Sequence, residues 1–366
     1  MPILSILFAA VFIYYLRYIF LFYKGLDREY QNFREDEPFV SVIVAARNEE
    51  QTLPGLLPLL IEQNYDTDKY EIIIADDEST DKTAQIVRDA MESCDNLHLL
   101  SVEPPQPGVS RKKNALAQAV EKSQGEIILA TDADCKVKPS WIKTMVKYFS
   151  ENVGFVAGLS LTQPAGSANL VETFEFFDMV VLFTAAAGAI GVDKPFSCSG
   201  QNLAYIREAF DEVNGYKKVK NHQSGDDVLL MQLIQNAGHK IRFAFDERAY
   251  NSTVSEKNLV KFLNQRIRWA SNEKPQSKLN KEFFFYLVDV FLLNLLLVVT
   301  LFIEPSLFFI FFIIKAIFEI FLLNKGRKTF SLGSRVMWLY PIWAIFNPIY
   351  IILTAIGEKL HLFRWK

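Results

Sequence analysis

The sequence predicts an α/β protein in which a doubly wound, mostly parallel sheet is joined to membrane-spanning helices. Two observations predict this class. Between Phe39 and Ser255, short apolar runs typical of strands alternate with helical stretches about every 25–30 residues, which is the order that gives parallel sheets. Outside that region the apolar residues, which make up 50% of the 366 residues, are concentrated in stretches long enough to cross a bilayer.

The composition excludes several classes of protein. A net charge of −3 argues against a nucleic-acid binder, which normally carries a basic surplus. The three cysteines, Cys94, Cys135 and Cys198, are scattered and form no C-x-x-C pair. Neither a disulfide framework nor a zinc site is therefore expected, and the hydrophilic part is expected in a reducing compartment.

The first segment, Pro2–Tyr23, is predicted to be a membrane anchor within residues 1–24. No basic residues precede its apolar stretch and no small-residue cleavage site follows it, so it does not resemble a signal peptide. Basic residues follow instead, and under the positive-inside rule they place the next part of the chain in the cytoplasm. These residues are Arg17, Lys24, Arg28 and Arg34.

Three further membrane segments are expected in residues 283–357. Eleven of the 31 phenylalanines lie between Phe283 and Phe321. The loop Asn324–Arg335 is basic and is also expected in the cytoplasm. The three segments are Phe283–Ile303, Leu307–Leu323 and Val336–Ile356.

Two of these membrane segments contain residues that are unusual in a membrane helix, namely a charged pair and two prolines. Lys315 and Glu319 lie one helical turn apart and are expected to neutralise each other, with a functional role as the alternative. Pro341 and Pro348 indicate that the last segment is kinked or re-entrant.

The α/β region, residues 39–255, begins with four predicted strands. They are the apolar runs Phe39–Ala46, Tyr70–Ala75, Leu97–Val102 and Glu126–Ala130. Helices are predicted from Asn48, over Asp81–Met91 and over Lys113–Lys122. Ligands of such sheets bind at the carboxyl ends of the strands, so the functional residues are expected there.

Polar and acidic residues follow three of these strands. Arg47-Asn48-Glu49 follows the first, and Asp76-Asp77 follows the second. Helix capping accounts for Ser79–Asp81 but not for Asp76, whose carboxylate can accept hydrogen bonds from a nucleobase or a ribose. No G-x-G-x-x-G and no G-K-[ST] motif occurs, so neither a dinucleotide fingerprint nor a P-loop explains this edge.

Asp132-Ala133-Asp134 follows the fourth strand. In an extended segment residues i and i+2 point to the same side, so two carboxylates converge there. Such a pair is costly without a cation, and Mg²⁺ or Mn²⁺ would also hold a diphosphate. The alternative is a plain turn before a helix, because Lys136–Ser140 resembles a helix start.

Two clusters lie further along the chain. Gly225-Asp226-Asp227 precedes a predicted helix, Val228–Ala237, and capping accounts for only one of the two acids. Gln265-Arg266-Ile267-Arg268-Trp269 lies on an amphipathic helical stretch. Arg268 could offer a guanidinium to phosphate and Trp269 an indole to a ring, or both could simply belong to that amphipathic helix.

Taken in chain order, these pieces resemble the membrane-attached family 2 glycosyltransferases, such as those that make cellulose, hyaluronan and glycosylated ceramide. The resemblance covers about Phe39 to Ala270. It implies the GT-A nucleotide-diphosphosugar transferase fold, a nucleotide-sugar donor, Mg²⁺ or Mn²⁺, and inversion at the anomeric carbon.

The resemblance also implies roles for individual residues. Asp227 matches the general base, with Asp226 in place of a preceding Glu, and Asp132 and Asp134 match the metal-binding D-x-D. Lys112 occupies the position of a basic residue usually preceded by Gly, although here Arg111 precedes it. The residues implied on the donor side are Ala45, Arg47, Asn48, Glu49, Asp76, Asp77, Lys112, Asp132, Gln265, Arg268 and Trp269. Those implied on the acceptor side are Ser199, Gly200, Asn202 and Trp269.

The expected function is transfer of a sugar to a lipid or lipid-linked acceptor at the cytoplasmic face of a bacterial inner membrane, without any nucleic-acid partner. A processive polysaccharide synthase is the alternative within this class, but it typically needs more membrane helices. A nucleotide-binding sensor would not need Asp227 or the motif Gln265–Trp269, and a transporter would show internal repeats.

Two stretches are expected to meet the lipid. The uncharged stretch Met179–Val192 is taken as too short to span, so it is predicted to be a core helix or one on the membrane surface. Residues 256–282 are predicted to form an amphipathic interfacial region, with the basic residues Lys257, Lys261, Arg266 and Arg268 suited to an anionic lipid surface.

Overall fold

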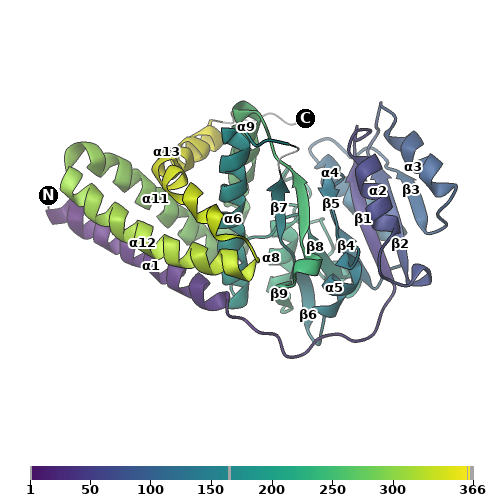
Figure 1. Cartoon of the computed structure of the whole chain (residues 1–366). Coiled ribbons are helices and arrows are strands. Elements are labelled where there is room, and N and C mark those ends of the chain that lie inside the picture. Colours follow the sequence, from purple (N-terminus) through teal and green to yellow (C-terminus); the bar gives the residue numbers. More distant parts are fainter. Residues whose placement is uncertain (1, 164–165, 361, 363–366) are drawn as a thin grey trace. The chain divides into compact units, whose positions relative to one another are not determined.

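The computed structural model describes residues 2–163, 166–360 and 362 of the chain. The chain divides into two compact units. The first unit comprises residues Met1–Arg28, Pro164–Phe196 and Ser255–Lys366, and the second comprises Glu29–Gln163 and Ser197–Val254. The first unit consists mainly of long helices, and the second is built on β-sheets (Figure 1).

A seven-stranded sheet forms the centre of the second unit among the described residues, in the order β3-β2-β1-β4-β8-β6-β9 (Figure 1). Only β8 runs antiparallel to its neighbours, so the predicted doubly wound, mostly parallel sheet is confirmed. The strands are β1 (Val40–Ala46), β2 (Tyr70–Asp76), β3 (Leu97–Ser101), β4 (Ile127–Ala130), β6 (Val153–Ala157), β8 (Leu203–Ile206) and β9 (Lys240–Phe243).

A second, three-stranded sheet has the order β5-β10-β7. Its strands are β5 (Cys135–Lys136), β10 (Asn251–Val254) and β7 (Ser160–Gln163). β5 begins directly after Asp134, where the sequence resembled a helix start, and the next helix begins only at Trp141. Strands of two to four residues carry too little periodicity to be recognised from sequence.

Helices cover both faces of the large sheet. They are α2 (Leu53–Ile61), α3 (Thr83–Met91), α4 (Arg111–Lys122), α5 (Trp141–Lys147), α7 (Arg207–Glu212) and α8 (Val228–Asn236), with short 3₁₀ helices η1 (Thr67–Lys69) and η2 (Glu247–Ala249). α4 packs against β1 and β2 and begins two residues before the predicted Lys113.

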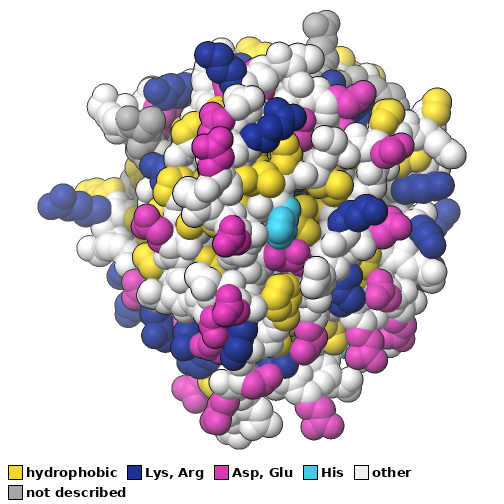
Figure 2. All heavy atoms as spheres, turned by 90° about the vertical axis from the view of Figure 1, so that its right-hand side faces the viewer, with side chains coloured by type: hydrophobic (Ala, Val, Ile, Leu, Met, Phe, Trp, Pro, Cys, Tyr) yellow, Lys and Arg dark blue, Asp and Glu magenta, His cyan; other side chains and the backbone are white. Residues whose placement is uncertain are grey.

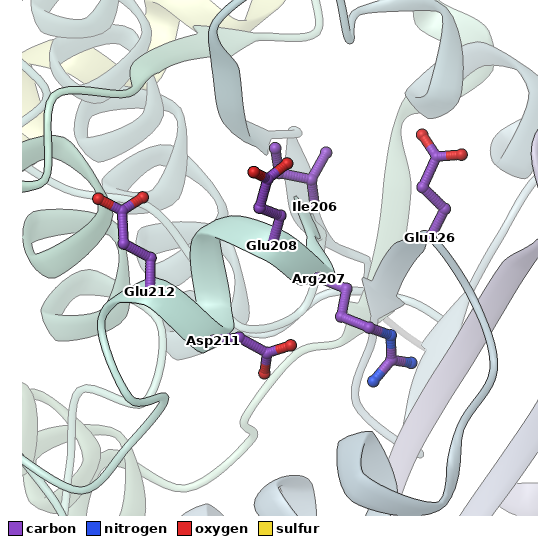
Figure 3. A pocket seen from close by; sticks show the side chains of 6 residues that line it. All are labelled: Glu126, Ile206, Arg207, Glu208, Asp211 and Glu212. Carbon is purple, nitrogen blue, oxygen red and sulfur yellow. The ribbon is translucent and has the colours of Figure 1, made fainter.

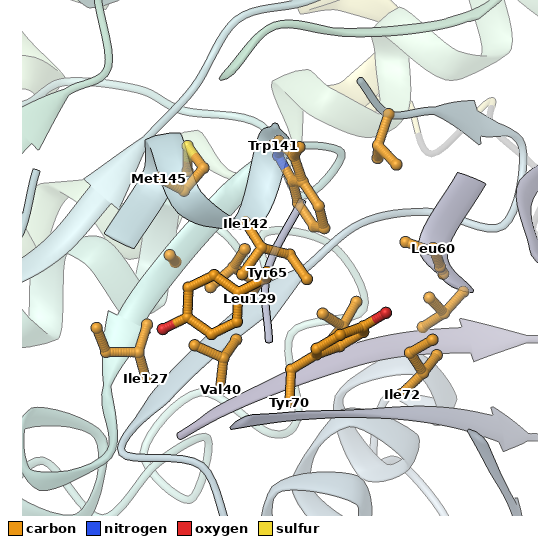
Figure 4. Packing of buried hydrophobic residues seen from close by; sticks show 14 of the residues in the cluster. Val40, Leu60, Tyr65, Tyr70, Ile72, Ile127, Leu129, Trp141, Ile142 and Met145 are labelled. Atoms are coloured by element: carbon orange, nitrogen blue, oxygen red, sulfur yellow. The ribbon is translucent and has the colours of Figure 1, made fainter. Parts of the chain in front are cut away.

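A large hydrophobic core lies between the sheet and helices α2 and α5. Figure 4 shows Val40, Tyr70 and Ile127 from three adjacent strands packed near Trp141 and Met145 from α5. Alternate residues of a strand point to opposite faces, so the residues between these belong to the face on which α4 packs. Because both faces of the sheet are buried, these strands appear in the sequence as continuous apolar runs.

The surface of the molecule seen in Figure 2 has the character of a water-exposed face. Acidic and basic side chains are interspersed on it, and hydrophobic side chains appear only in small groups. This mixture is typical of a soluble domain surface.

The first unit contains five helices, among the described residues, that are long and apolar enough to cross a membrane. The four predicted segments correspond to α1 (Pro2–Gly25), α11 (Lys281–Ile303), α12 (Pro305–Thr329) and α13 (Tyr340–Lys359), the last preceded by the 3₁₀ helix η3 (Ser334–Leu339). Shorter helices α9 (Leu259–Ala270) and α10 (Glu273–Leu279) complete the unit. α13 continues through Pro348.

The fifth helix is α6 (Leu170–Gly191), and it corrects one expectation. The uncharged stretch Met179–Val192 was taken as too short to span, but it is the second half of a 22-residue helix. The helix extends toward its N-terminus because Asn169 and Glu172 form a reciprocal capping box there. Length alone therefore does not exclude α6 from a membrane.

Glycines bring α6 against α1 and α12. A Cβ atom on Gly188 would lie 2.5 Å from the carbonyl oxygen of Phe22, and one on Gly25 would lie 1.8 Å from that of Gly188. A Cβ on Gly326 would meet the side chain of Thr184 at 2.2 Å. Gly25 ends α1 and Gly326 lies in the last turn of α12, so α6 passes the basic ends of both helices (Figure 1).

The expected Lys315–Glu319 pair is present and buried. The Lys315 Nζ lies 2.8 Å from the Glu319 Oε1, and the Glu319 carboxylate also accepts hydrogen bonds from the hydroxyls of Tyr15 and Tyr340. Burying two charges is tolerated when they are paired and hydrogen-bonded, as they are here.

Candidate active site

The polar residues after β1 and β2 lie side by side because these strands are parallel neighbours. In the register of the pair, Ala45 is opposite Ala75 and Ala46 is opposite Asp76. The backbone N–H of Asp77 donates to the Ala46 carbonyl at 2.9 Å, so the pairing continues to the end of both strands. The sheet therefore delivers both loops to one edge, as the sequence predicts.

Asn48 and Glu49 connect the β1 loop to the β2 loop. Asn48 has a φ of +57°, a left-handed conformation that Asn tolerates better than most residues. Its Oδ1 accepts from the backbone N–H of Thr80 at 2.8 Å, and the N–H of Glu49 donates to the Thr83 hydroxyl at 2.7 Å. These bonds make the two loops one rigid wall.

Asp76 and Asp77 are both buried but have different partners. Asp77 receives two parallel hydrogen bonds of 2.8 Å from Arg111, and the Nη1 of Arg47 lies 3.7 Å from its Oδ2. Asp76 accepts a weaker bond of 3.3 Å from the N–H of Ser79. The carboxylate of Asp77 is thus engaged within the protein, whereas Asp76 retains more capacity to bind a ligand.

Lys112 joins two of the predicted acidic clusters. Its ammonium lies 2.8 Å from Asp132 Oδ1 and 3.1 Å from Asp226 Oδ2. Burial lowers the pKa of Lys112, but the two carboxylates outweigh it and the pKa lies well above the usual range. The structure therefore brings the D-x-D and the acid pair before α8 together around one cation.

The carboxylate of Asp134 lies near the carboxylate of Asp132, which carries the same charge. Burial and the neighbouring Asp132 carboxylate raise its pKa to about 6. Two carboxylates held this close favour a divalent cation between them, and both supply the oxygen ligands that Mg²⁺ and Mn²⁺ prefer. Within the described residues no group of three His, Cys, Asp or Glu side chains is arranged to hold a metal.

Asp227 is held from two sides. Its Oδ2 accepts from the backbone N–H of Gly200 at 2.8 Å, and its Oδ1 accepts from Val228 N–H at 2.7 Å, which also makes it the N-cap of α8. Burial and the charge of Asp226 raise its pKa to about 6. For Asp226 burial acts in the same direction, but Lys112 and Lys113 outweigh it and lower its pKa below the usual value.

The predicted acceptor-side segment contributes mainly backbone. A Cβ on Gly200 would lie 3.2 Å from Asp226 Oδ2, so a small residue suits this close approach. The Ser199 hydroxyl accepts from the N–H of Gln201 at 3.3 Å. Asn202 is fully buried, with its amide bonded to Trp141, Leu159 and Ala249, so its side chain serves packing beneath the site.

These residues surround a small hollow at the carboxyl end of β4. It is lined by Lys112, Leu116, Ala130, Thr131, Asp132, Gly200, Leu203, Tyr216 and Asp226. A larger and more open pocket lies at the other end of the same strand, where Glu126 precedes β4 (Figure 3). Figure 3 shows it flanked by acidic side chains of α7, none of which sequence analysis placed in the site.

The Gln265–Trp269 motif lies on α9 in the first unit. Arg266, between the motif residues, is buried and donates from Nε to Asp178 of α6 at 3.0 Å. Its guanidinium lies 4.1 Å from the ring centre of Trp269, and its Nη1 donates to Gln265 at 2.8 Å. Arg266 thus fixes both Gln265 and Trp269 on α9.

Comparison with known proteins decides the family. The profile described as "Glycosyl transferase family 21" matches residues 4–360. This chain belongs to glycosyl transferase family 21. The predicted class, a nucleotide-sugar-dependent glycosyltransferase of GT-A type, is therefore confirmed, as is its being an enzyme.

Individual relatives agree with this assignment. The chain is 24% identical to the probable glycosyltransferase YdaM of Bacillus subtilis over 93% of its own length and 81% of the relative's. It is also 39% identical to β-monoglucosyldiacylglycerol synthase of Nostoc sp.. That aligned region comprises 32% of this chain and 25% of the relative.

A solved structure confirms the fold. The mannosyltransferase PcManGT from Pyrobaculum calidifontis, in complex with GDP-Man and Mn²⁺, superposes with a TM-score of 0.58 at 18% identity. The superposition covers 98% of this family 21 chain and 99% of PcManGT.

Sequence reasoning missed two residues of the site. Arg111, noted only as a departure from Gly, is the partner of Asp77, and Lys113 binds the loop that leads to Asp226. The signal was available: three consecutive cations at a helix N-terminus oppose the helix dipole and so require partners elsewhere.

Proposed function

We propose that this family 21 enzyme transfers a single sugar from a nucleotide diphosphate to a hydroxyl of a lipid or lipid-linked acceptor. The observation that carries the proposal is the placement of Asp227, a half-buried carboxylate held by two backbone N–H groups beside Lys112 and Asp132. A base and a cationic, diphosphate-binding region are the two elements that such a transfer requires.

Asp227 is proposed as the general base. Its pKa of about 6 lies below the pH of the cytoplasm, so the carboxylate is mostly ionised there and can accept the acceptor's proton. The bonds from Gly200 and Val228 orient its oxygens without neutralising them. With one base and no second carboxylate assigned as nucleophile, a single displacement with inversion is the mechanism we favour.

Asp132 and Asp134 are proposed to hold Mg²⁺ or Mn²⁺. Bound there, the ion would stabilise the negative charge of the departing diphosphate. The raised pKa of Asp134, caused by its burial and by the neighbouring Asp132 carboxylate, supports this role, because a bound cation would stabilise the ionised form. The presence of Mn²⁺ and GDP-Man in PcManGT is consistent with it.

The wall formed by the β1 and β2 loops is proposed to bind the nucleoside. Asp76 would accept hydrogen bonds from base or ribose, with Arg47, Asn48 and Glu49 shaping the wall. Asp77 would act indirectly, since it holds Arg111 in place. Lys112, already between two carboxylates, is proposed to bind the donor's phosphates.

A lipid acceptor is favoured because the first unit places Trp269 and its motif on the same body as the long apolar helices. Gln265, Arg268 and Trp269 are proposed to meet the diphosphate and the acceptor. The similarity to β-monoglucosyldiacylglycerol synthase, whose name states a lipid product, supports this choice. Processive polymer synthesis remains the second candidate within the class.

The catalytic unit is proposed to face the cytoplasm of a bacterial cell. The basic ends of α1 and α12, next to which α6 lies, support that orientation. In this arrangement α6 runs along the cytoplasmic surface of the bilayer rather than across it.

The test is product identification. Purified enzyme in lipid nanodiscs would be supplied with radiolabelled UDP- and GDP-hexoses and a panel of diacylglycerol, ceramide and a polyprenyl-diphosphate-linked glycan. We expect one sugar to be added to one lipid class, with inverted configuration by NMR. A ladder of polymer products, or no lipid product with any donor, would contradict the proposal.

A further inference from the structure

Three consecutive basic residues begin α4, which is the wrong end of a helix for cations. The N-terminus carries partial positive charge, so an exposed cation there is destabilising. Arg111 and Lys112 are accounted for by carboxylates, namely Asp77, Asp132 and Asp226. Lys113 is not explained in that way.

Lys113 is buried, with 1% of its surface exposed. Its ammonium donates to two backbone carbonyls, that of Ser224 at 2.6 Å and that of His222. Burial lowers the pKa of Lys113 to about 8, so the site tolerates the charge at a cost. A methionine or leucine would fill the same space without that cost, which indicates that the two hydrogen bonds matter.

The two carbonyls belong to the loop that leads into the catalytic acids. Ser224 is followed by Gly225, whose φ of +75° turns the chain, and then directly by Asp226 and Asp227. Ser110, the N-cap of α4, strengthens the same contact: its N–H donates to Lys220 O at 2.8 Å and its hydroxyl donates to Gln223 O at 3.3 Å.

We infer that Lys113 is a positioning residue for the reaction: by holding the carbonyls of His222 and Ser224 it sets the direction in which Asp226 and Asp227 enter the site. Only Gly225 separates the clamped backbone from Asp226, so a shift of the loop moves the acids directly. The first turn of α4 thereby fixes three parts of the site, through Arg111, Lys112 and Lys113. This inference rests on the proposed role of Asp227 as base.

The first test compares Lys113→Met with the control Lys122→Met, an exposed lysine in the last turn of the same helix. We expect Lys113→Met to lower kcat on the order of 100-fold, the effect of a misplacement of about 1 Å, with donor Kd unchanged. Lys122→Met should behave as wild type. A loss of donor affinity, or an unchanged kcat, would overturn the inference.

A double-mutant cycle separates positioning from general stability. If Lys113 acts through Asp227, adding Lys113→Met to Asp227→Asn should lower the residual rate less than twofold, because the oriented base is already gone. Independent, multiplicative losses would mean that Lys113 serves another part of the protein. Should Lys113→Met fail to fold, Lys113→Gln, which keeps a donor, takes its place in the cycle.

Hydrogen exchange supplies a readout that needs no substrate. Amides of residues 222–227 should exchange faster in Lys113→Met, while those of β2 should not change. Equal exchange in the two proteins would overturn the inference. If wild type transfers no sugar at all, the proposed function fails, yet this experiment still decides whether Lys113 orders the loop.

Discussion

Asp227 is both the proposed general base and the N-cap of α8, and these two roles predict different outcomes of substitution. Asp227→Asn keeps an oxygen for the N–H groups of Gly200 or Val228 but removes the base. We expect kcat to fall by a factor on the order of 10²–10⁴ while donor Kd stays within a factor of a few. Isothermal titration with nucleotide sugar and single-turnover kinetics measure the two quantities.

The control for this substitution is Asp211→Asn on α7, an acid outside the site, which should leave both quantities unchanged. A collapse of donor affinity in Asp227→Asn would instead make Asp227 a donor ligand or a purely structural cap.

The raised pKa of Asp227 predicts an acid limb in the pH profile. Since the reactive form is the carboxylate and its pKa is about 6, kcat/KM should be constant above that value and fall about tenfold per pH unit below it. The residual activity of Asp227→Asn should lack this limb. A limb that persists in Asp227→Asn would assign the titration to another group.

Asp134 allows the metal to be tested without relying on Asp227. Asp134→Asn removes one of two converging charges, so we expect at least a tenfold weaker affinity for Mn²⁺ and a matching loss of kcat at low metal concentration. Chelation should abolish transfer by the wild type. Asp95→Asn, an exposed acid, serves as the control. Full activity in excess chelator would refute the metal site.

Single residues were predictable where local position decides their place. Asp76 ends one buried strand and Asp132 lies just beyond another, so the alternation of strands and helices, which implies parallel strands, was enough to put them at one edge. The run of cations at Arg111–Lys113 indicated a need for partners, but the partners of Arg111 and Lys113 could not be identified, since they lie more than 30 and 100 residues away, respectively. Asn202 matched a motif, yet its amide is used in packing, a distinction that depends on tertiary contacts.

Among the elements, α6 contains a glycine that is unfavourable for helix formation but allows close packing against α1. Ala in place of a helical Gly normally stabilises by about 1 kcal/mol. At Gly188, however, the added Cβ would meet the Phe22 backbone at 2.5 Å, and overpacking costs about 1–3 kcal/mol. We therefore expect Gly188→Ala to lower Tm in detergent, as followed by circular dichroism.

Gly55 in α2 is the matched control, because a Cβ there meets nothing within 4 Å. Gly55→Ala should raise Tm or leave it unchanged. Equal shifts for both variants would show that the contact between α1 and α6 does not limit stability.

At this scale the sequence was informative for long, regular elements. The first four strands and the membrane helices were expected near their observed bounds because their periodicity extends over many residues. The three-stranded sheet and the first half of α6 were missed. The former has strands too short for a pattern, and the latter contains Glu172, Glu175 and Asp178, buried acids that read as solvent-exposed.

For the whole molecule, the basic helix ends predict one orientation. Lys24 lies in the last turn of α1, and Arg327 and Lys328 lie in the last turn of α12, so both ends should face the cytoplasm. Reporter fusions after Arg34 and after Lys328 should show cytoplasmic activity, for example β-galactosidase but not alkaline phosphatase. Opposite behaviour at both positions would contradict the proposed orientation and, with it, access to cytoplasmic donors.

The two units are interleaved along the chain, since it passes between them after residues 28, 163, 196 and 254. On the ribosome, α6 therefore emerges long before α11, α12 and α13, the helices with which it shares a unit. Until those arrive, α6 can pack against α1 but not against α12 or α13, and an apolar helix that is only partly covered invites aggregation. The enzyme would then become stably folded only when the finished polypeptide is released, and not when the sheet is complete. A chain that ends before Phe283 would therefore be a substrate for quality-control proteases.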